Sequence, residues 1–202
     1  MLEARDLECM RGERRLFAGL SFSLAAGELL QVRGPNGSGK TSLLRMLCGL
    51  VPPAGGEIRW RGSTLKEVAE DFYREVAYLG HLPALKDELT AEENLRIASG
   101  LEGVEIDRRE TWAALKRMGL GGRELLPAKV LSAGQRRRVA LAKLLVCGAA
   151  LWVLDEPLTA LDKSAVALVQ SVIAEHLAKG GVAVITTHHD LDLPSRHLEL
   201  GA

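Results

Sequence analysis

Aromatic residues are scarce in this chain, with three Trp, two Tyr and three Phe among 202 residues, or 4% of the total. A surface that stacks RNA bases or sugar rings needs such side chains, so we do not expect one to dominate. A net charge is also missing, because 26 Lys and Arg residues balance 26 Asp and Glu residues. A general nucleic-acid-binding protein usually carries a basic excess, and the balance argues against that class.

Cysteine is rare, and long apolar runs are absent. Cys9, Cys48 and Cys147 are odd in number and lie far apart, which is typical of a reducing compartment and indicates no disulfide framework. No Cys-x-x-Cys pair offers a metal site, so we expect three small buried residues. The longest nearly apolar stretch, residues 144–154, is shorter than the roughly 20 residues that span a bilayer. The acidic start of the chain has no apolar segment, so we expect no signal peptide.

The apolar residues that are present alternate between strand spacing and helix spacing. Helical spacing at residues 42–50 and 164–178 predicts two amphipathic helices, the second ending at Gly180. Strands are expected at residues 2–9, 17–24, 29–32, 57–60, 149–154 and 182–187. Strands that alternate with helices predict an α/β fold.

The middle of the chain, residues 90–148, is rich in Ala, Leu, Glu, Arg and Lys and has no clear strand pattern. We expect several helices here, with breaks at Gly100, at Gly103 and at residues 119–122. The length favours one domain over residues 1–202. Within it we predict a core of residues 1–80 and 149–202 and a helical insertion at residues 81–148.

Residues 34–41 read Gly-Pro-Asn-Gly-Ser-Gly-Lys-Thr and match the phosphate-binding pattern G-x-x-x-x-G-K-[ST] between an expected strand and an expected helix. Glycines let a backbone wrap around an anion, and N–H groups at a helix N-terminus point toward phosphates. We expect Lys40 to bridge the β- and γ-phosphates and Thr41 to place its hydroxyl on Mg²⁺. The predicted nucleotide-binding residues of this loop are Gly34, Pro35, Asn36, Gly37, Ser38, Gly39, Lys40, Thr41 and Ser42.

Two adjacent carboxylates, Asp155 and Glu156, follow an apolar run. They stand at the expected carboxyl end of a strand, where ligands bind in open α/β sheets. Asp155 is the candidate metal ligand, directly or through water. Glu156 is the candidate to orient and polarise an attacking water. An exposed acidic turn is the alternative interpretation.

Residues 131–135, Leu-Ser-Ala-Gly-Gln, complete a set of motifs that resembles the ATP-binding-cassette (ABC) ATPases, whose usual pattern is LSGGQ. The resemblance runs from about residue 2 to residue 189. It implies a P-loop NTPase with a RecA-like mixed-sheet core, a helical subdomain, and ATP and Mg²⁺ as cofactors. It also implies that His188 contacts the γ-phosphate, and that Ser132, Gly134 and Gln135 act on ATP held by a second copy of the chain. A serine N-cap and free N–H groups suit an anion.

Two positions depart from the family's pattern. His81 stands where a glutamine is usual, and one ring nitrogen could reach Mg²⁺ or its water. Arg11 stands near the usual adenine-stacking aromatic; it could stack through its guanidinium plane, or Phe17 could serve instead.

The short length and the runs at residues 78–81 and 89–95 are similar to the ATPase subunit of the bacterial cytochrome c maturation system, a haem exporter. This resemblance implies small integral membrane partners that handle haem. It also implies that the chain is a peripheral protein on the cytoplasmic face of the bacterial inner membrane. It also implies ATP hydrolysis that releases a haem-loaded periplasmic chaperone, and no nucleic-acid partner. Another small-molecule exporter, or a soluble non-transport cassette, is the alternative.

Three further side-chain groups are expected to be structural or exposed. Arg136, Arg137 and Arg138 are predicted to lie on a solvated or dimer-facing helix surface, because the neutral net charge disfavours nucleic acid. His176 and His197 are predicted to be surface residues.

Overall fold

A computed structural model of the chain describes residues 1–201. Its centre is a five-stranded parallel sheet. In spatial order the strands are β6 (Val76–Leu79), β7 (Leu151–Asp155), β8 (Val182–Thr186), β3 (Leu29–Arg33) and β9 (Arg196–Glu199). All residues of β7 and β8 are buried, as a central parallel strand covered on both faces requires.

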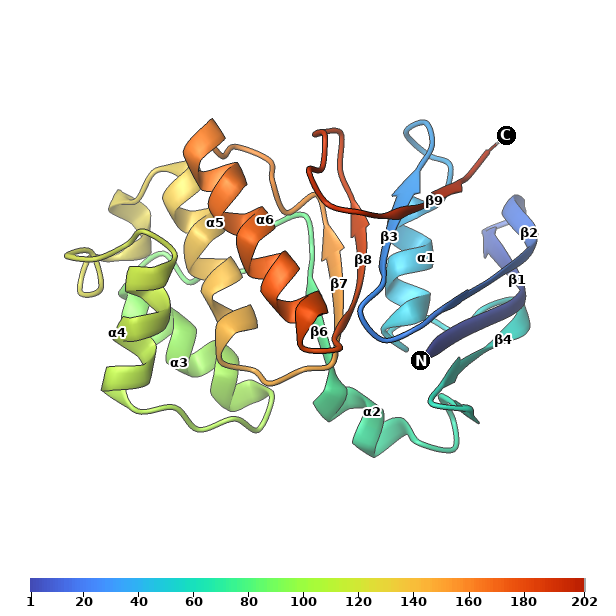
Figure 1. Cartoon of the computed structure of the whole chain (residues 1–202), viewed down its shortest axis with the longest axis horizontal. Coiled ribbons are helices and arrows are strands. Elements are labelled where there is room, and N and C mark those ends of the chain that lie inside the picture. Colours follow the sequence, from blue (N-terminus) through green and yellow to red (C-terminus); the bar gives the residue numbers. More distant parts are fainter. Residues whose placement is uncertain (202) are drawn as a thin grey trace.

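A second, antiparallel sheet lies on one side of the parallel sheet (Figure 1). Its strands, in spatial order, are β2 (Arg14–Leu24), β1 (Leu2–Arg11), β4 (Gly55–Trp60) and β5 (Ser63–Thr64). Helix α1 (Lys40–Leu47) lies between the two sheets. Its leucines pack with residues of both sheets in one apolar cluster, so the helix that follows the phosphate loop is held from two sides.

The helical half of the molecule lies on the opposite side (Figure 1). It contains α3 (Ala91–Leu101), α4 (Arg108–Arg117) and α5 (Ala133–Ala142), and α6 (Lys163–Ala178) lies between α5 and the sheet. Two short 3₁₀ turns, η1 (Ala128–Val130) and η2 (Lys143–Leu145), flank α5. A second apolar cluster joins these helices to β7 and β8.

The N-termini of three helices carry the same local device. Reciprocal hydrogen bonds between the first cap residue and the third helical residue start α3, α4 and α5, formed by Thr90 and Glu93, by Asp107 and Glu110, and by Ser132 and Gln135. Each such box satisfies two N–H groups that a helix start would otherwise leave without a partner.

The structure confirms the α/β fold, and strands form at all six expected places. The helices α3, α4 and α5 fall inside residues 81–148, although the predicted subdomain boundaries stay a prediction. The expected break at Gly100 is wrong, because α3 continues through it to Leu101. Sequence reasoning missed four elements: β5, the helix α2 (Ala69–Glu75), β6 and β9.

All three cysteines are free and buried, as predicted. Within residues 1–201, the structure contains no helix with both the length and the apolar composition that crossing a membrane requires.

Candidate nucleotide site

The predicted phosphate loop joins β3 to α1. Gly34, the first residue of the loop, has a φ of 140°, and a Cβ atom there would lie 2.3 Å from the carbonyl oxygen of Leu200. Only glycine fits this position, because any side chain would collide with the backbone after β9. The end of the parallel sheet therefore shapes the start of the loop.

The N-terminus of α1 has no side-chain cap. Its N-cap residue, Gly39, has a left-handed backbone, so the first N–H groups of the helix face the loop without a side-chain partner. Beside them, the buried hydroxyl oxygen of Ser38 has no hydrogen-bond partner within residues 1–201. Unpaired buried donors at a helix N-terminus are what a phosphate group would satisfy.

Lys40 folds back over the loop. Its ammonium group donates hydrogen bonds to the carbonyl oxygens of Gly34 at 2.7 Å and Pro35 at 3.1 Å. The positive charge is thus held above the loop's N–H groups, where it adds to the attraction for phosphate.

Asp155 ends β7 beside the loop and is 4% exposed. Thr41 Oγ1 donates to Asp155 Oδ2 at 2.9 Å, and Thr186 Oγ1 donates to Asp155 Oδ1 at 2.7 Å. A hydroxyl and a carboxylate side by side are the hard oxygen ligands that Mg²⁺ takes when substrate phosphates complete its shell. Residues 1–201 hold no cluster of three or more His, Cys, Asp or Glu that could bind a metal.

Glu156 has an unusual backbone for its residue type. Its φ is 50°, a left-handed conformation that costs of order 1 kcal/mol or more in a non-glycine residue. Its N–H group is held by Thr186, through the carbonyl oxygen at 3.1 Å and Oγ1 at 3.0 Å. The Glu156 side chain is 14% exposed, and its Oε1 lies 3.5 Å from Nε2 of His188, which is 71% exposed.

A cavity of about 420 Å³ brings these groups together. Its lining residues are Arg11, Leu16, Asn36, Gly37, Gly39, Lys40, Thr41, Ser42, His81, Asp155, Glu156, Thr159 and His188. Of the two adenine-stacking candidates, Arg11 lines the cavity, whereas Phe17 packs beside Gly39 and in an apolar cluster. Sequence reasoning missed Leu16 and Thr159. Leu16 precedes the stacking candidate Phe17, and Thr159 lies three residues after Glu156.

The Leu-Ser-Ala-Gly-Gln segment lies away from this cavity. Ser132 caps α5 and is exposed, while Gly134 and Gln135 are partly exposed. None of the three lines the cavity. Gly134 instead packs against the loop after β7, since a Cβ atom there would lie 2.7 Å from the carbonyl oxygen of Ala160.

Comparisons with known proteins agree on one family. The family described as ABC transporter matches residues 17–159. This chain belongs to the ABC transporter family. The cytochrome c biogenesis ATP-binding export protein CcmA of Nitrosospira multiformis is 62% identical over 192 residues, 95% of this chain and 93% of that protein.

Solved ABC cassettes share the fold along nearly the whole chain. A putative ABC transporter ATP-binding protein from Pyrococcus furiosus has a TM-score of 0.86 and 27% identity, covering 98% of this chain and 96% of that one. The cassette MJ0796, solved as a dimer in a post-hydrolysis state with ADP and phosphate, has a TM-score of 0.84 and 22% identity, covering 99% and 94%.

Within this ABC cassette, the arginine run after the Leu-Ser-Ala-Gly-Gln segment is not a uniform surface. Arg136 pairs with Asp87 at 2.6 Å, but Arg137 is only 3% exposed. The expectation of a solvated or dimer-facing face is therefore wrong for Arg137. Burial lowers the pKa of its guanidinium, and the nearby carboxylates of Asp155 and Glu156 act in the opposite direction.

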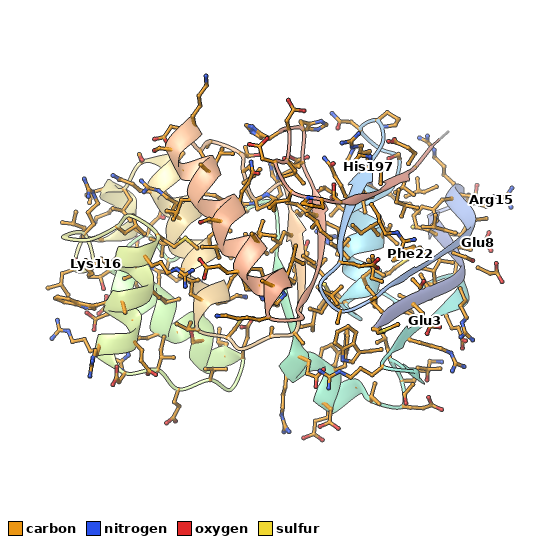
Figure 2. The ribbon with its side chains drawn as sticks, viewed as in Figure 1. Glu3, Glu8, Arg15, Phe22, Lys116 and His197 are labelled. Carbon is orange, nitrogen blue, oxygen red and sulfur yellow. The ribbon has the colours of Figure 1, made fainter. Side chains whose placement is uncertain are left out.

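The two peripheral histidines of the cassette differ. His197 is exposed on β9 (Figure 2), as predicted. His176 is half-buried and stacks on Trp152 with 3.8 Å between ring centroids, so its prediction as a surface residue is wrong. The helical periodicity of α6 could not predict this contact, because it does not show which strand residue lies beside the C-terminal end of the helix.

Proposed function

We propose that this chain is the ATP-hydrolysing subunit of an export complex for cytochrome c biogenesis. The observation that carries the proposal is the cavity in which Lys40, Asp155, Glu156 and His188 converge on an uncapped helix N-terminus. The 62% identity to a protein named for ATP-binding export in cytochrome c biogenesis supports the assignment to that process.

Phosphate binding falls to the loop and to Lys40. The first residues of α1 and Lys40 line the cavity, and the buried Ser38 hydroxyl belongs to the same loop. The backbone N–H groups of the loop and the Lys40 ammonium bind the β- and γ-phosphates of ATP, with the Ser38 hydroxyl as a further donor. Arg11 and Leu16 line the same cavity; Arg11 is our candidate to stack on the adenine through its guanidinium plane.

Thr41 and Asp155 are the proposed ligands of Mg²⁺, with His81 as a further candidate through water. When bound, Mg²⁺ neutralises charge on the phosphates. Thr186 fixes the Asp155 carboxylate from the side opposite Thr41, which keeps both oxygens oriented without a second acidic residue.

Glu156 orients and polarises the attacking water, and His188 contacts the γ-phosphate. The side chain of Glu156 leaves a backbone that Thr186 anchors at its N–H group, so the carboxylate enters the cavity from a fixed origin. Its contact with His188 at 3.5 Å places the two groups on the same side of the cavity.

A second copy of the chain completes each site. Ser132, Gly134 and Gln135 are outside the cavity but present an exposed helix N-terminus, which suits the γ-phosphate held by a partner. The dimeric state of MJ0796 supports the same assembly. ATP spans both copies only when they close, and this differential affinity shifts the open–closed equilibrium.

Membrane subunits that handle haem are the proposed partners, with the chain peripheral at the cytoplasmic face of the bacterial inner membrane. A largely apolar groove of about 580 Å³ lies next to the cavity, and His81, Leu82 and Leu95 help to line it. Leu82 is 76% exposed. We place the coupling contact here, so that dimer closure moves the membrane subunits and releases a haem-loaded periplasmic chaperone.

Replacing the proposed catalytic carboxylate tests the ATPase mechanism. We expect Glu156→Gln to bind ATP normally, to lose turnover by roughly a thousandfold, and to accumulate as a closed dimer in size-exclusion chromatography with ATP. Glu175→Gln, an exposed carboxylate on α6, is the matched control and should behave as wild type. Unchanged turnover in Glu156→Gln would remove that residue from the mechanism.

Purification from native membranes in mild detergent tests the partners. Co-purification of small membrane proteins with bound haem, identified by mass spectrometry and absorbance, is the expected result. Recovery with unrelated permease subunits would overturn the cargo and keep the ATPase. Recovery in the soluble fraction alone would indicate a non-transport cassette.

A further inference from the structure

Arg137 makes an unusually complete set of contacts for a buried side chain. A guanidinium has five N–H donors, and here five backbone carbonyl oxygens accept from it. The acceptors are Gly80 at 2.9 Å, His81 at 3.1 Å, Asp155 at 2.8 Å, Glu156 at 2.8 Å and Pro157 at 3.2 Å. No carboxylate within residues 1–201 forms an ion pair with Arg137, so its contacts fix backbone positions.

The five acceptors belong to two segments that follow neighbouring strands. Gly80 and His81 follow β6, and residues 155–157 end and follow β7. β6 and β7 are paired in the sheet up to Leu79 and Leu154. Beyond that point the Arg137 guanidinium connects the two segments. Nη1 serves the first segment, and Nη2 and Nε serve the second.

Each segment carries a group that faces the nucleotide cavity. His81 lines both the cavity and the apolar groove, as do Thr41 and Asp155, so its loop borders both. Glu156 is held at its carbonyl by Arg137 and at its N–H group by Thr186. The left-handed backbone of Glu156 is therefore fixed from both sides, as a strained conformation requires.

We propose that Arg137 is a positioning residue that ties the His81 loop to Glu156, so that a displacement of the loop at the groove changes the orientation of the Glu156 carboxylate. The inference rests on the proposed catalytic role of Glu156. Arg137 itself contacts neither the cavity nor the groove. Its effect passes entirely through the backbone of the residues that it holds.

The kinetic test compares Arg137 with its neighbour on the same helix. Arg137→Gln keeps at most two of the five donors, and we expect kcat for ATP hydrolysis to fall by roughly ten- to a hundredfold while the Kd for ATP stays about the same. Arg138→Gln is the matched control, because Arg138 donates to the carbonyl oxygens of Met118 and Gly119, away from the site. Its kcat should equal that of wild type even if its Tm falls equally.

The conservative variant Arg137→Lys guards against a variant that does not fold. Lysine keeps the charge but has three donors at one point in place of a planar fork, so it cannot join both segments. We expect its kcat to lie between those of wild type and Arg137→Gln. Full rescue by lysine would show that charge alone matters and would overturn the proposal.

Hydrogen exchange on the full chain without nucleotide tests the link independently of catalysis. The backbone N–H groups of the non-proline residues in 80–85 and 156–160 should exchange faster in Arg137→Gln than in wild type, with Arg138→Gln unchanged there. Unchanged exchange in a folded Arg137→Gln overturns the proposal, as does faster exchange with an unchanged kcat. A failure of the proposed function itself is detected by a different experiment, because Glu156→Gln would then hydrolyse ATP at the wild-type rate.

Discussion

Two helices of this molecule start in opposite ways, and both starts belong to the proposed ATP chemistry. Within residues 1–201, helix α1 begins after Gly39 without a side-chain cap, beside a Ser38 hydroxyl that has no hydrogen-bond partner. Helix α5 begins at Ser132, whose side chain accepts from the Gln135 N–H group while the Gln135 side chain accepts from the Ser132 N–H group. The first start leaves its donors for a ligand of the same chain, and the second satisfies two of them internally.

The difference follows from what holds each helix. Both sheets clamp α1 through its buried leucines, so tertiary packing stabilises it without a cap. The N-terminus of α5 projects outward with Ser132 exposed, and a capping box keeps that end helical before a partner arrives. A helix start that is packed between two sheets can stay uncapped, whereas the starts of α3, α4 and α5 are each stabilised by a capping box.

The largest effect is expected from the charge above the uncapped start. Lys40→Ala removes the ammonium that donates to Gly34 and Pro35, and the loop then opposes the phosphate charge with N–H groups alone. We expect ATP binding to weaken by roughly a hundredfold and hydrolysis to be lost, measured by titration calorimetry and phosphate release. An unaltered Kd would refute the phosphate-loop assignment.

A smaller effect is expected from the unpaired hydroxyl. Ser38→Ala removes a buried donor that has no partner within residues 1–201, so the nucleotide-free chain should be as stable as wild type or slightly more stable. The Kd for ATP should rise by about tenfold, because one hydrogen bond to phosphate is lost. Thermal melts with and without ATP measure both changes, and a destabilised nucleotide-free chain would contradict the contrast with α5.

The opposite pattern is expected at the capped start. Ser132→Ala should lower the free energy of unfolding by about 1 kcal/mol and slow hydrolysis in the dimer, with the affinity of the monomer for ATP unchanged. Thr90→Ala removes the equivalent cap of α3 and is the matched control. It should cost similar stability in denaturant titrations and leave hydrolysis unchanged; equal loss of hydrolysis in both would remove Ser132 from the ATP site.

The smallest effect concerns a charged cap. Asp162 starts α6, and hydrogen bonds from the Ala165 N–H group and from Ser164 hold the pKa of its carboxyl below the usual 3.8. A depressed folded-state pKa contributes stability above pH 3.8 that is lost as the pH falls toward the folded-state value. Asp162→Asn keeps a neutral cap, so its stability should fall less than that of wild type between pH 5 and pH 3. Ser132→Ala should leave that pH dependence unchanged.

The site was readable from the sequence where one short segment carries both the chemistry and the geometry. The phosphate loop spans residues 34–41, Asp155 is the last residue of the buried strand β7, and Glu156 directly follows it, so motif and position coincided. Arg137 was not readable, because its neighbours Arg136 and Arg138 are also basic and its five acceptors lie about 20 and 57 residues away. A buried guanidinium whose hydrogen bonds go to carbonyl oxygens far away in the sequence leaves no periodic pattern that would reveal it.

The missed elements have similar causes. The edge strand β9 reads Arg-His-Leu-Glu and is mostly exposed, so it lacks the apolar run that marks a buried strand. Helix α2 is seven residues long and buries only Phe72, which is too little for a helical period to show. Gly100 did not end α3, because the capping box and the packed face of that helix outweigh the cost of one glycine.

The left-handed backbone of Glu156 sets stability against activity at a single position. A glycine there would adopt the same φ without strain and would raise the melting temperature, yet the chain would lose the carboxylate that its chemistry needs. Selection for stability alone would therefore favour glycine at this position, and selection for turnover retains Glu156.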